Sequence, residues 1–594
     1  MSFSDKIKGY TGQNPFSDSQ ARNFSDEKVT SEFLPISLFW TLFNDQHEIL
    51  LGSRGCGKTF LLKMMRYSMI KTVEDSRAAE LVEKKEFIAL YVPMHLEFVA
   101  PLNGINSEKM QILLFQVLFN CLLANSVMVE LNSMLEEVDD VIEKARKRVS
   151  LVKKLDNIWF GDDQSEICDF EDLREKIDKM YYNIDWINFN ETSIPVVFRR
   201  QICSTLLSVK NSISHILEFE AEPTWIICID EAEFLNEICQ KCINNIFRSD
   251  SNRIALKVAT LPFYHKTLTT LEEGISVSDG NDFSYKIVDM DYSSNDFIRL
   301  TDKLCRHRIN SRFEKDSNCI GLEDFVGKIG NDDYIDYYRE IVKDDRASYE
   351  VIEKEIIKSF PEKRRENAPN YSNLRKTVYD KYAPIFFLRE VHKIAKKGNN
   401  KPGWFAGVKT IRKVSQGNPR MFIQIMCSLF DKARETKLTT RAQHDVIYKF
   451  ACDICESTKA LQKNGPEAYK KLNAISEKLY EKVHGINLVI GGLNFAVPDG
   501  SYEWLEVAIA YSRVITDDET KRRGISKSSK LMLSCAYAVK YWLPIRGDVP
   551  ISIPELEDIN TNSYTVKGKI KKKNYDDPNQ LTIFEVMRDE ANKK

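Results

Sequence analysis

The sequence has little glycine and proline, almost no net charge and few histidines. Its 24 Gly and 18 Pro in 594 residues are too few for a collagen-like or low-complexity chain. Because 85 Lys and Arg nearly balance 87 Asp and Glu, bulk charge does not indicate a polyanion binder, and nucleic-acid contact would need a local patch. The eight histidines form no H-E-x-x-H motif, so nothing supports a metalloprotease.

Thirteen scattered cysteines are typical of a reducing compartment and not of a disulfide scaffold. Two C-x-x-C pairs occur, Cys239/Cys242 and Cys452/Cys455. Each pair lies in an amphipathic helical pattern, where cysteine is a common core residue. We favour core packing, with a zinc site shared by the two distant pairs as the alternative.

Two stretches of the sequence bear on export and membrane insertion. The first 24 residues contain no apolar run of the kind found in a secretory signal. The stretch 110–129 carries no charge, but it contains about one amide or hydroxyl per turn, which is unusual in lipid and ordinary in a buried helix. We therefore expect a core helix, no membrane contact and a cytoplasmic protein.

Length predicts roughly four domain-sized units at about 150 residues each. Five short apolar runs, at 47–51, 87–92, 225–229, 254–259 and 285–290, alternate with helical patterns and predict a parallel α/β sheet. We predict an α/β base over 1–292 with a helical insertion at about 130–220, a helical lid over 293–435 with a charged insertion at about 310–400, an α+β module over 436–560 and a polar basic tail over 561–594.

The C-terminal module is expected to hold helices followed by a β-rich end. Phe495–Val497 and Tyr541–Pro544 are its strand candidates.

A phosphate-binding motif follows the first apolar run. The pattern G-x-x-x-x-G-K-[ST] is matched by Gly52, Ser53, Arg54, Gly55, Cys56, Gly57, Lys58 and Thr59. Its glycines let the backbone curl round phosphate oxygens, and the following helix adds its positive end. Lys58 would contact the β and γ phosphates of ATP, and Thr59 would offer a hydroxyl to Mg²⁺.

The third apolar run ends in two carboxylates, Asp230 and Glu231. Ligands of open α/β sheets bind at the carboxyl edge, where these side chains would lie. Asp230 would hold Mg²⁺, and Glu231 would activate the attacking water. The alternative is a solvated acidic turn.

These features, with Thr260 after the fourth strand and Ser415-Gln-Gly-Asn-Pro-Arg420 later, resemble the AAA+ ATPases, specifically the origin-recognition initiators and their prokaryotic relatives. The resemblance implies a three-layer base, a helical lid and often a C-terminal winged helix. It also implies that Thr260 is the sensor 1 residue and that Arg420 is the sensor 2 arginine, reaching the phosphates bidentately. A surface ion pair for Arg420 and an ordinary strand-end role for Thr260 are the alternatives.

The sequence departs from that family in one place. In that family the stretch before the fifth strand commonly supplies an arginine finger to a neighbouring subunit. Here this stretch, Leu261–Ser284, contains no arginine and offers His265 and Lys266. Arg248 and Arg253 are the nearest substitutes. Because a finger is worth about 10³–10⁵ in rate, hydrolysis is expected to be slow or to depend on a partner.

The densest basic segment is a candidate DNA contact through Lys521, Arg522, Arg523, Lys527 and Lys530, with a solvated loop as the alternative.

The leading hypothesis is an ATP-hydrolysing switch that acts on nucleic acid or on a protein effector encoded nearby. By resemblance, its setting is a prokaryotic mobile element or antiphage defence. The alternatives are a nucleotide-stabilised DNA-binding protein with little turnover, and a scaffold that forms homo-oligomers with ATP.

Overall fold

The computed structural model describes residues 7–19, 24–161, 167, 169–182, 194–248, 253–311, 313, 321–327, 349–358, 382–397, 403–461, 464–489, 491–498 and 500–545. They belong to a compact unit, Met1–Ile553. The tail predicted for 561–594 and much of the charged insertion predicted at 310–400 lie outside the described residues.

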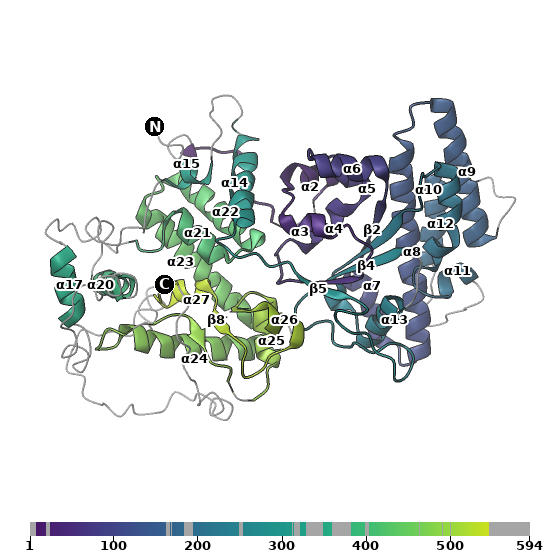
Figure 1. Cartoon of the computed structure of the whole chain (residues 1–594). Coiled ribbons are helices and arrows are strands. Elements are labelled where there is room, and N and C mark those ends of the chain that lie inside the picture. Colours follow the sequence, from purple (N-terminus) through teal and green to yellow (C-terminus); the bar gives the residue numbers. More distant parts are fainter. Residues whose placement is uncertain are drawn as a thin grey trace. The chain divides into compact units, whose positions relative to one another are not determined.

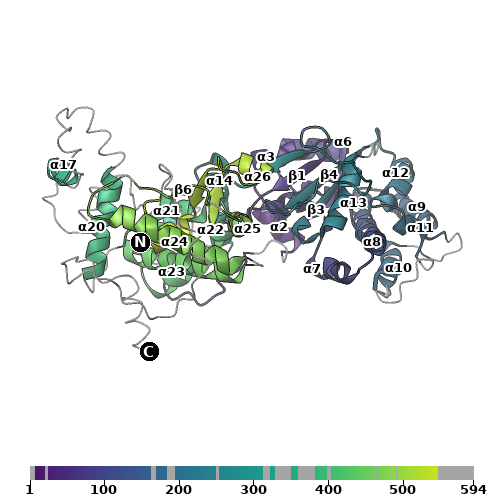
Figure 2. The ribbon, with the colours of Figure 1, turned by 90° about the horizontal axis from the view of Figure 1, so that it is seen from below.

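A five-stranded parallel sheet forms the base. Its strands are β1 (Glu48–Leu51), β2 (Phe87–Pro93), β3 (Thr224–Asp230), β4 (Ile254–Thr260) and β5 (Ser284–Ile287), in the order β2-β3-β4-β1-β5. Figure 2 labels β1, β3 and β4 of this sheet. Four of the five read as continuous apolar runs because both faces of the sheet are covered. The predicted α/β fold class is confirmed. Strand β5 ends earlier than expected, at Ile287, before the carboxylate of Asp289 turns toward the phosphate loop.

Helices cover both faces of the sheet. One face packs on α2 (Asp26–Glu32), α3 (Ser37–Thr41), α4 (Lys58–Met65), α5 (Tyr67–Ile70) and α6 (Ser76–Lys84) through a core that includes Phe39 and Leu62. The other face packs on α8 (Glu108–Leu135) and α13 (Glu237–Arg248) through a core that includes Phe115 and Trp225. The base is therefore a three-layer sandwich.

The helical insertion between β2 and β3 begins earlier than predicted, with α7 (Leu96–Val99). It continues through α8, α9 (Val141–Phe160), α10 (Phe170–Tyr182), α11 (Val196–Arg199) and α12 (Ser204–Leu217). Helices α8, α9, α10 and α12 lie against one another as a bundle (Figure 1). Among the described residues, α8 alone is long and apolar enough to span a membrane, but 67% of its most apolar window is buried in the protein.

The lid is helical, as predicted. It contains α14 (Asn295–Asn310), α15 (Leu322–Val326), α17 (Tyr349–Lys358), α20 (Ala383–Lys397), α21 (Gly407–Ser415) and α22 (Pro419–Glu435). Helix α22 begins at a proline, after Asn418 caps it by accepting the N–H groups of Arg420 and Met421.

The C-terminal module combines helices with a small antiparallel sheet. Its helices are α23 (Thr440–Ser457), α24 (Gly465–His484), α25 (Glu503–Ala510), α26 (Asp518–Arg523) and α27 (Cys535–Lys540). Strands β6 (Asn494–Phe495), β8 (Leu531–Leu533) and β7 (Val514–Thr516) pair in that order. This arrangement is consistent with a winged helix.

One strand prediction in this module is wrong. Tyr541–Pro544 does not form a strand but follows the end of α27, where Trp542 has a positive φ of 50°. The N–H of Tyr541 bonds to the carbonyl of Tyr537, and the N–H of Leu543 bonds to that of Ala538, which closes the helix end. A four-residue apolar run cannot distinguish such a buried cap from a strand.

Candidate nucleotide site

The phosphate loop curves between β1 and α4. Gly55 and Gly57 have φ values of +92° and +110°, which side-chain-bearing residues rarely adopt. This turn brings the positive end of α4 to the cavity. Lys58 lies in the loop, where its Nζ donates to the carbonyls of Gly52 (2.6 Å) and Ser53 (3.3 Å). Burial by itself lowers the pKa of Lys58, but the surrounding acidic groups, Cys56 and Glu233 foremost, raise it.

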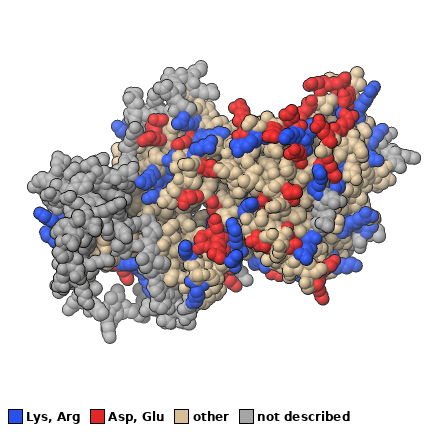
Figure 3. All heavy atoms as spheres, viewed as in Figure 1, with Lys and Arg blue, Asp and Glu red and all other residues tan. Residues whose placement is uncertain are grey.

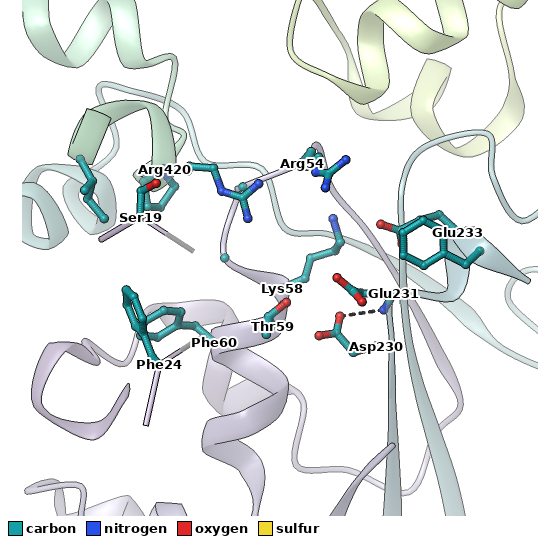
Figure 4. A pocket seen from close by; sticks show the side chains of 15 residues that line it. Ser19, Phe24, Arg54, Lys58, Thr59, Phe60, Asp230, Glu231, Glu233 and Arg420 are labelled. Atoms are coloured by element: carbon teal, nitrogen blue, oxygen red, sulfur yellow. Dashed lines mark hydrogen bonds between the residues drawn. The ribbon is translucent and has the colours of Figure 1, made fainter. Parts of the chain in front are cut away.

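The loop opens into a cavity that gathers the predicted site residues. Its lining comprises Ser19, Phe24, Arg54, Gly55, Gly57, Lys58, Thr59, Phe60, Asp230, Glu231, Glu233, Phe234, Pro419, Arg420 and Ile423 (Figure 4). The structure therefore brings Lys58 and Asp230 to one space although 170 or so residues separate them in the chain. The side chains of Arg54, Lys58 and Arg420 gather round that space in Figure 4.

Asp230 is held by three donors at the end of β3. Its Oδ2 accepts from the Tyr91 hydroxyl at 2.8 Å, its Oδ1 accepts from the Glu231 N–H at 2.9 Å, and the Thr59 hydroxyl also donates to this carboxylate. Burial raises the pKa of Asp230, and the hydroxyls of Thr59 and Tyr91 and the charge of Lys58 counteract part of that increase. A carboxylate beside a hydroxyl is the hard-oxygen chemistry that Mg²⁺ prefers, so Asp230 and Thr59 fit that ion.

Glu231 occupies a strained turn just after β3. Its φ is 57°, in the left-handed region that a glutamate rarely adopts. Its Oε2 lies 3.0 Å from Nδ1 of His95, a residue that follows β2. The glutamate is 20% exposed, so water can reach the carboxylate.

The Gly-Asn-Pro-Arg element of the lid contacts the phosphate loop directly. Asn418 Nδ2 donates to the carbonyl of Arg54 at 2.9 Å, and the Arg420 N–H donates to that of Gly55 at 3.4 Å. A methyl group added at Gly55 would come within 2.8 Å of Cβ of Arg420. The loop and the lid are therefore packed as closely as glycine permits.

Thr260 lies beside the cavity and not in its lining. It is fully buried at the end of β4, opposite Leu51, and its carbonyl accepts from the Gly52 N–H at 3.3 Å. Its hydroxyl has no hydrogen-bond partner among the described residues. Its role as sensor 1 stays a prediction.

The substitutes for an arginine finger are engaged away from the cavity. Arg248 pairs with Asp282 at 2.8 Å, and Arg253 donates to the carbonyl of Glu222. His265 is half-buried, with Nε2 2.9 Å from the side-chain oxygen of Asn244, and the Lys266 N–H donates to Gln240.

Three site features escaped the sequence reasoning. Glu233 is a third carboxylate in the lining, and its buried Oε2 has no hydrogen-bond partner among the described residues. Burial raises the pKa of Glu233. The spacing Asp-Glu-Ala-Glu could have revealed Glu233.

The second feature is an aromatic pair. Phe24 and Phe60 meet edge to face at 5.7 Å, giving the cavity an aromatic side suited to a base ring. The third feature is His95, which belongs to no sequence motif and so could not be identified from the sequence.

The side chains of the basic segment differ in burial and in their contacts. Lys521 is 10% exposed and pairs with Asp289 at 2.7 Å, and Arg523 pairs with Glu519 on its own helix. Arg522, Lys527 and Lys530 are exposed. On the face shown in Figure 3, basic and acidic side chains are interspersed over the described surface.

The cysteine pairs lie in helices. Cys239 and Cys242 on α13 are buried, as is Cys455 on α23, while Cys452 is half-buried. Within the described ranges, no cluster of three or more His, Cys, Asp or Glu side chains forms a metal site.

A sheet of this order, with a phosphate loop after β1, an acidic pair at the end of β3 and a helical lid at the same cavity, is the architecture of the AAA+ class of P-loop proteins. The chain belongs to the ORC-CDC6-like family, whose model matches residues 14–553. Membership in this AAA+ family implies nucleotide binding. A comparison with curated proteins gives no match.

Proposed function

We propose that the chain binds Mg-ATP between base and lid, hydrolyses it and so switches a nucleic-acid or protein partner. The observation that carries the proposal is the single cavity lined by Lys58, Asp230, Glu231 and Arg420. Lys58 lies on α4 and Arg420 on α22, while Asp230 ends β3 and Glu231 follows it. Nucleotide bound there would contact the base and the lid together, so its γ-phosphate would set the position of the lid.

Each side chain has a distinct task in this proposal. Lys58 exchanges its contacts with the loop carbonyls for phosphate oxygens. Thr59 and Asp230 hold Mg²⁺, which offsets phosphate charge when bound. Glu231 accepts the proton of the attacking water, and Arg420 bridges phosphate oxygens from the lid. Phe24 and Phe60 provide apolar contact for the base.

Phosphate release by Glu231→Gln tests the hydrolysis. The amide keeps the size of the side chain but cannot accept the proton, so turnover should fall at least 100-fold while ATP still binds. Glu273→Gln, an exposed control for the same substitution, should keep the wild-type rate. Equal rates for wild type and Glu231→Gln would end the hydrolysis proposal.

A second candidate is a nucleotide-stabilised protein with little turnover. It is favoured by the arginine-free stretch Leu261–Ser284 and by the engagement of Arg248 with Asp282 and of Arg253 with the Glu222 carbonyl. In that case ATP raises the melting temperature by mass action, and no phosphate is released. A homo-oligomer in which another copy supplies an arginine would restore turnover at high protein concentration.

The proposed partner contact rests on the exposed basic side chains of Arg522, Lys527 and Lys530. If they bind DNA phosphates, the affinity falls steeply as salt rises, whereas a flat salt dependence contradicts DNA binding. The proposed setting is cytoplasmic, in a prokaryotic mobile element or antiphage defence system with an effector encoded nearby.

A further inference from the structure

Asp289 connects the phosphate loop to the C-terminal module. Its Oδ1 accepts both the N–H of Ser53 at 2.9 Å and the Ser53 hydroxyl at 2.6 Å. Its Oδ2 accepts from Nζ of Lys521, on α26, at 2.7 Å. One carboxylate thus ties the second residue of the loop to a helix more than 200 residues away in the chain.

The next loop residue is held by the same module. The N–H of Arg54 donates to the carbonyl of Ala510 at 3.0 Å, where α25 ends. The Arg54 guanidinium lies 5.7 Å from the ring centre of Tyr511. These contacts hold Ser53 and Arg54 in place. Both residues precede Gly55 and Gly57, the loop glycines with positive φ.

Lys521 compensates the negative charge of Asp289. Burial by itself raises the pKa of Asp289, but the ammonium of Lys521, together with the Ser53 donors, holds it below its usual range. Asp289 therefore stays negative beside a loop that is proposed to bind phosphate groups, which are also negative. Lys521 neutralises that charge from the C-terminal module.

We propose that Asp289 and Lys521 are positioning residues of the nucleotide site, through which the docked C-terminal module sets the nucleotide affinity of the base. This inference rests on the proposed nucleotide binding. Lys521 acts through Asp289 and Ser53 and does not touch the reacting atoms. By linkage, nucleotide binding strengthens the docking of α26 by the same factor by which docking strengthens nucleotide binding.

Titration of the full chain with Mg-ADP tests the inference. Lys521→Met leaves Asp289 charged and uncompensated, so ADP affinity should fall at least tenfold. Lys521→Arg, which keeps the charge, should stay within threefold of wild type. Combining Lys521→Met with Asp289→Asn removes both charges while an oxygen remains for Ser53, so most of the affinity should return.

Lys471→Met is the matched control. Lys471 lies in the same module and also pairs with a carboxylate at 2.7 Å, that of Glu467, but this pair lies within α24. It should change ADP affinity less than twofold. In turnover assays, Lys521→Met should raise KM and leave kcat near the wild-type value, a split that general loss of folded protein would not give.

Hydrogen exchange of the wild type provides a test that needs no variant. ADP should increase the protection of amides in 518–524 and leave those of α24 unchanged. Equal ADP affinities for Lys521→Met and Lys471→Met, or unchanged protection of 518–524, would overturn the inference while leaving nucleotide binding intact. A wild-type chain that binds no ADP would overturn both.

Discussion

Nδ1 of His95 lies 3.0 Å from Oε2 of Glu231, the carboxylate proposed to activate water. His95 is 55% exposed and follows β2, so it reaches Glu231 from the strand beside β3. If Nδ1 carries the proton it donates to this carboxylate, so the contact occupies an oxygen with which the proposed general base would accept a proton from water.

His95→Ala should therefore raise the basal rate of phosphate release by about 2- to 10-fold, the range that corresponds to one hydrogen bond of 0.5–1.5 kcal/mol. Single-turnover phosphate release measures this directly. His215→Ala, at an exposed position on α12, is the control and should leave the rate unchanged. A slower rate in His95→Ala would show that the histidine assists Glu231.

Two glycines with the same φ allow the cost of backbone strain to be distinguished from the cost of a steric clash. Gly417 and Gly161 both have a φ of +73°, but a Cβ at Gly417 would lie 1.8 Å from the carbonyl oxygen of Met290, whereas one at Gly161 meets nothing within 4 Å. Gly161→Ala should cost about 1–2 kcal/mol of unfolding free energy from backbone strain alone. Gly417→Ala should cost more than about 3 kcal/mol, because the lid must also move away from the base.

Thermal or urea unfolding of both variants checks this prediction. Gly417→Ala should also weaken ADP binding, since the displaced element carries Asn418 and Arg420. Equal losses of stability in the two variants would mean that Gly417 does not hold the lid close.

Three histidines gather round Trp542 in the C-terminal half. The rings of His392 and His444 lie 4.8 and 5.2 Å from the indole, and Nε2 of His484 lies 2.7 Å from the Trp542 carbonyl oxygen. Burial lowers the pKa of His392 to about 2, that of His444 to about 3 and that of His484 to about 4.

These lowered values predict acid sensitivity. Above about pH 6.5 the histidines are neutral in both states. As the pH falls below that value, the unfolded chain binds protons that the folded chain cannot bind. Stability is therefore lost by about 1.4 kcal/mol per pH unit for each such group.

His444→Asn should reduce the loss of stability per pH unit between pH 6 and pH 5 by about the contribution of one histidine. The asparagine oxygen can replace Nδ1 as acceptor for the Phe405 N–H. Urea unfolding at pH 5, 6 and 7 gives the slope, and His215→Asn, at an exposed position, should not alter it. A slope unchanged by His444→Asn would show that this ring is protonated in the folded protein.

Local patterns predicted the strands and the phosphate loop because four of the five strands are continuous apolar runs and the loop motif is contiguous. The end of β5, a strand with Ser, Tyr and Lys, was predicted less well. The pairing of loop and acids followed from the rule that ligands bind at the carboxyl edge of such sheets. The contacts of Glu231 with His95 and of Asp289 with Lys521 could not be predicted, since 136 and 232 positions separate the partners. The strand predicted at Tyr541–Pro544 was wrong because aromatic residues suit a buried helix end as well as a strand.

The most direct test of the whole account is the affinity of the full chain for Mg-ATP, compared between wild type and Lys58→Ala by calorimetric titration. Lys58 is buried in the loop, and its ammonium is the charge that the loop motif places at the β and γ phosphates. We expect wild type to bind one ATP per chain and Lys58→Ala to bind at least 100-fold more weakly. Equal affinities, or no binding by wild type, would contradict the account.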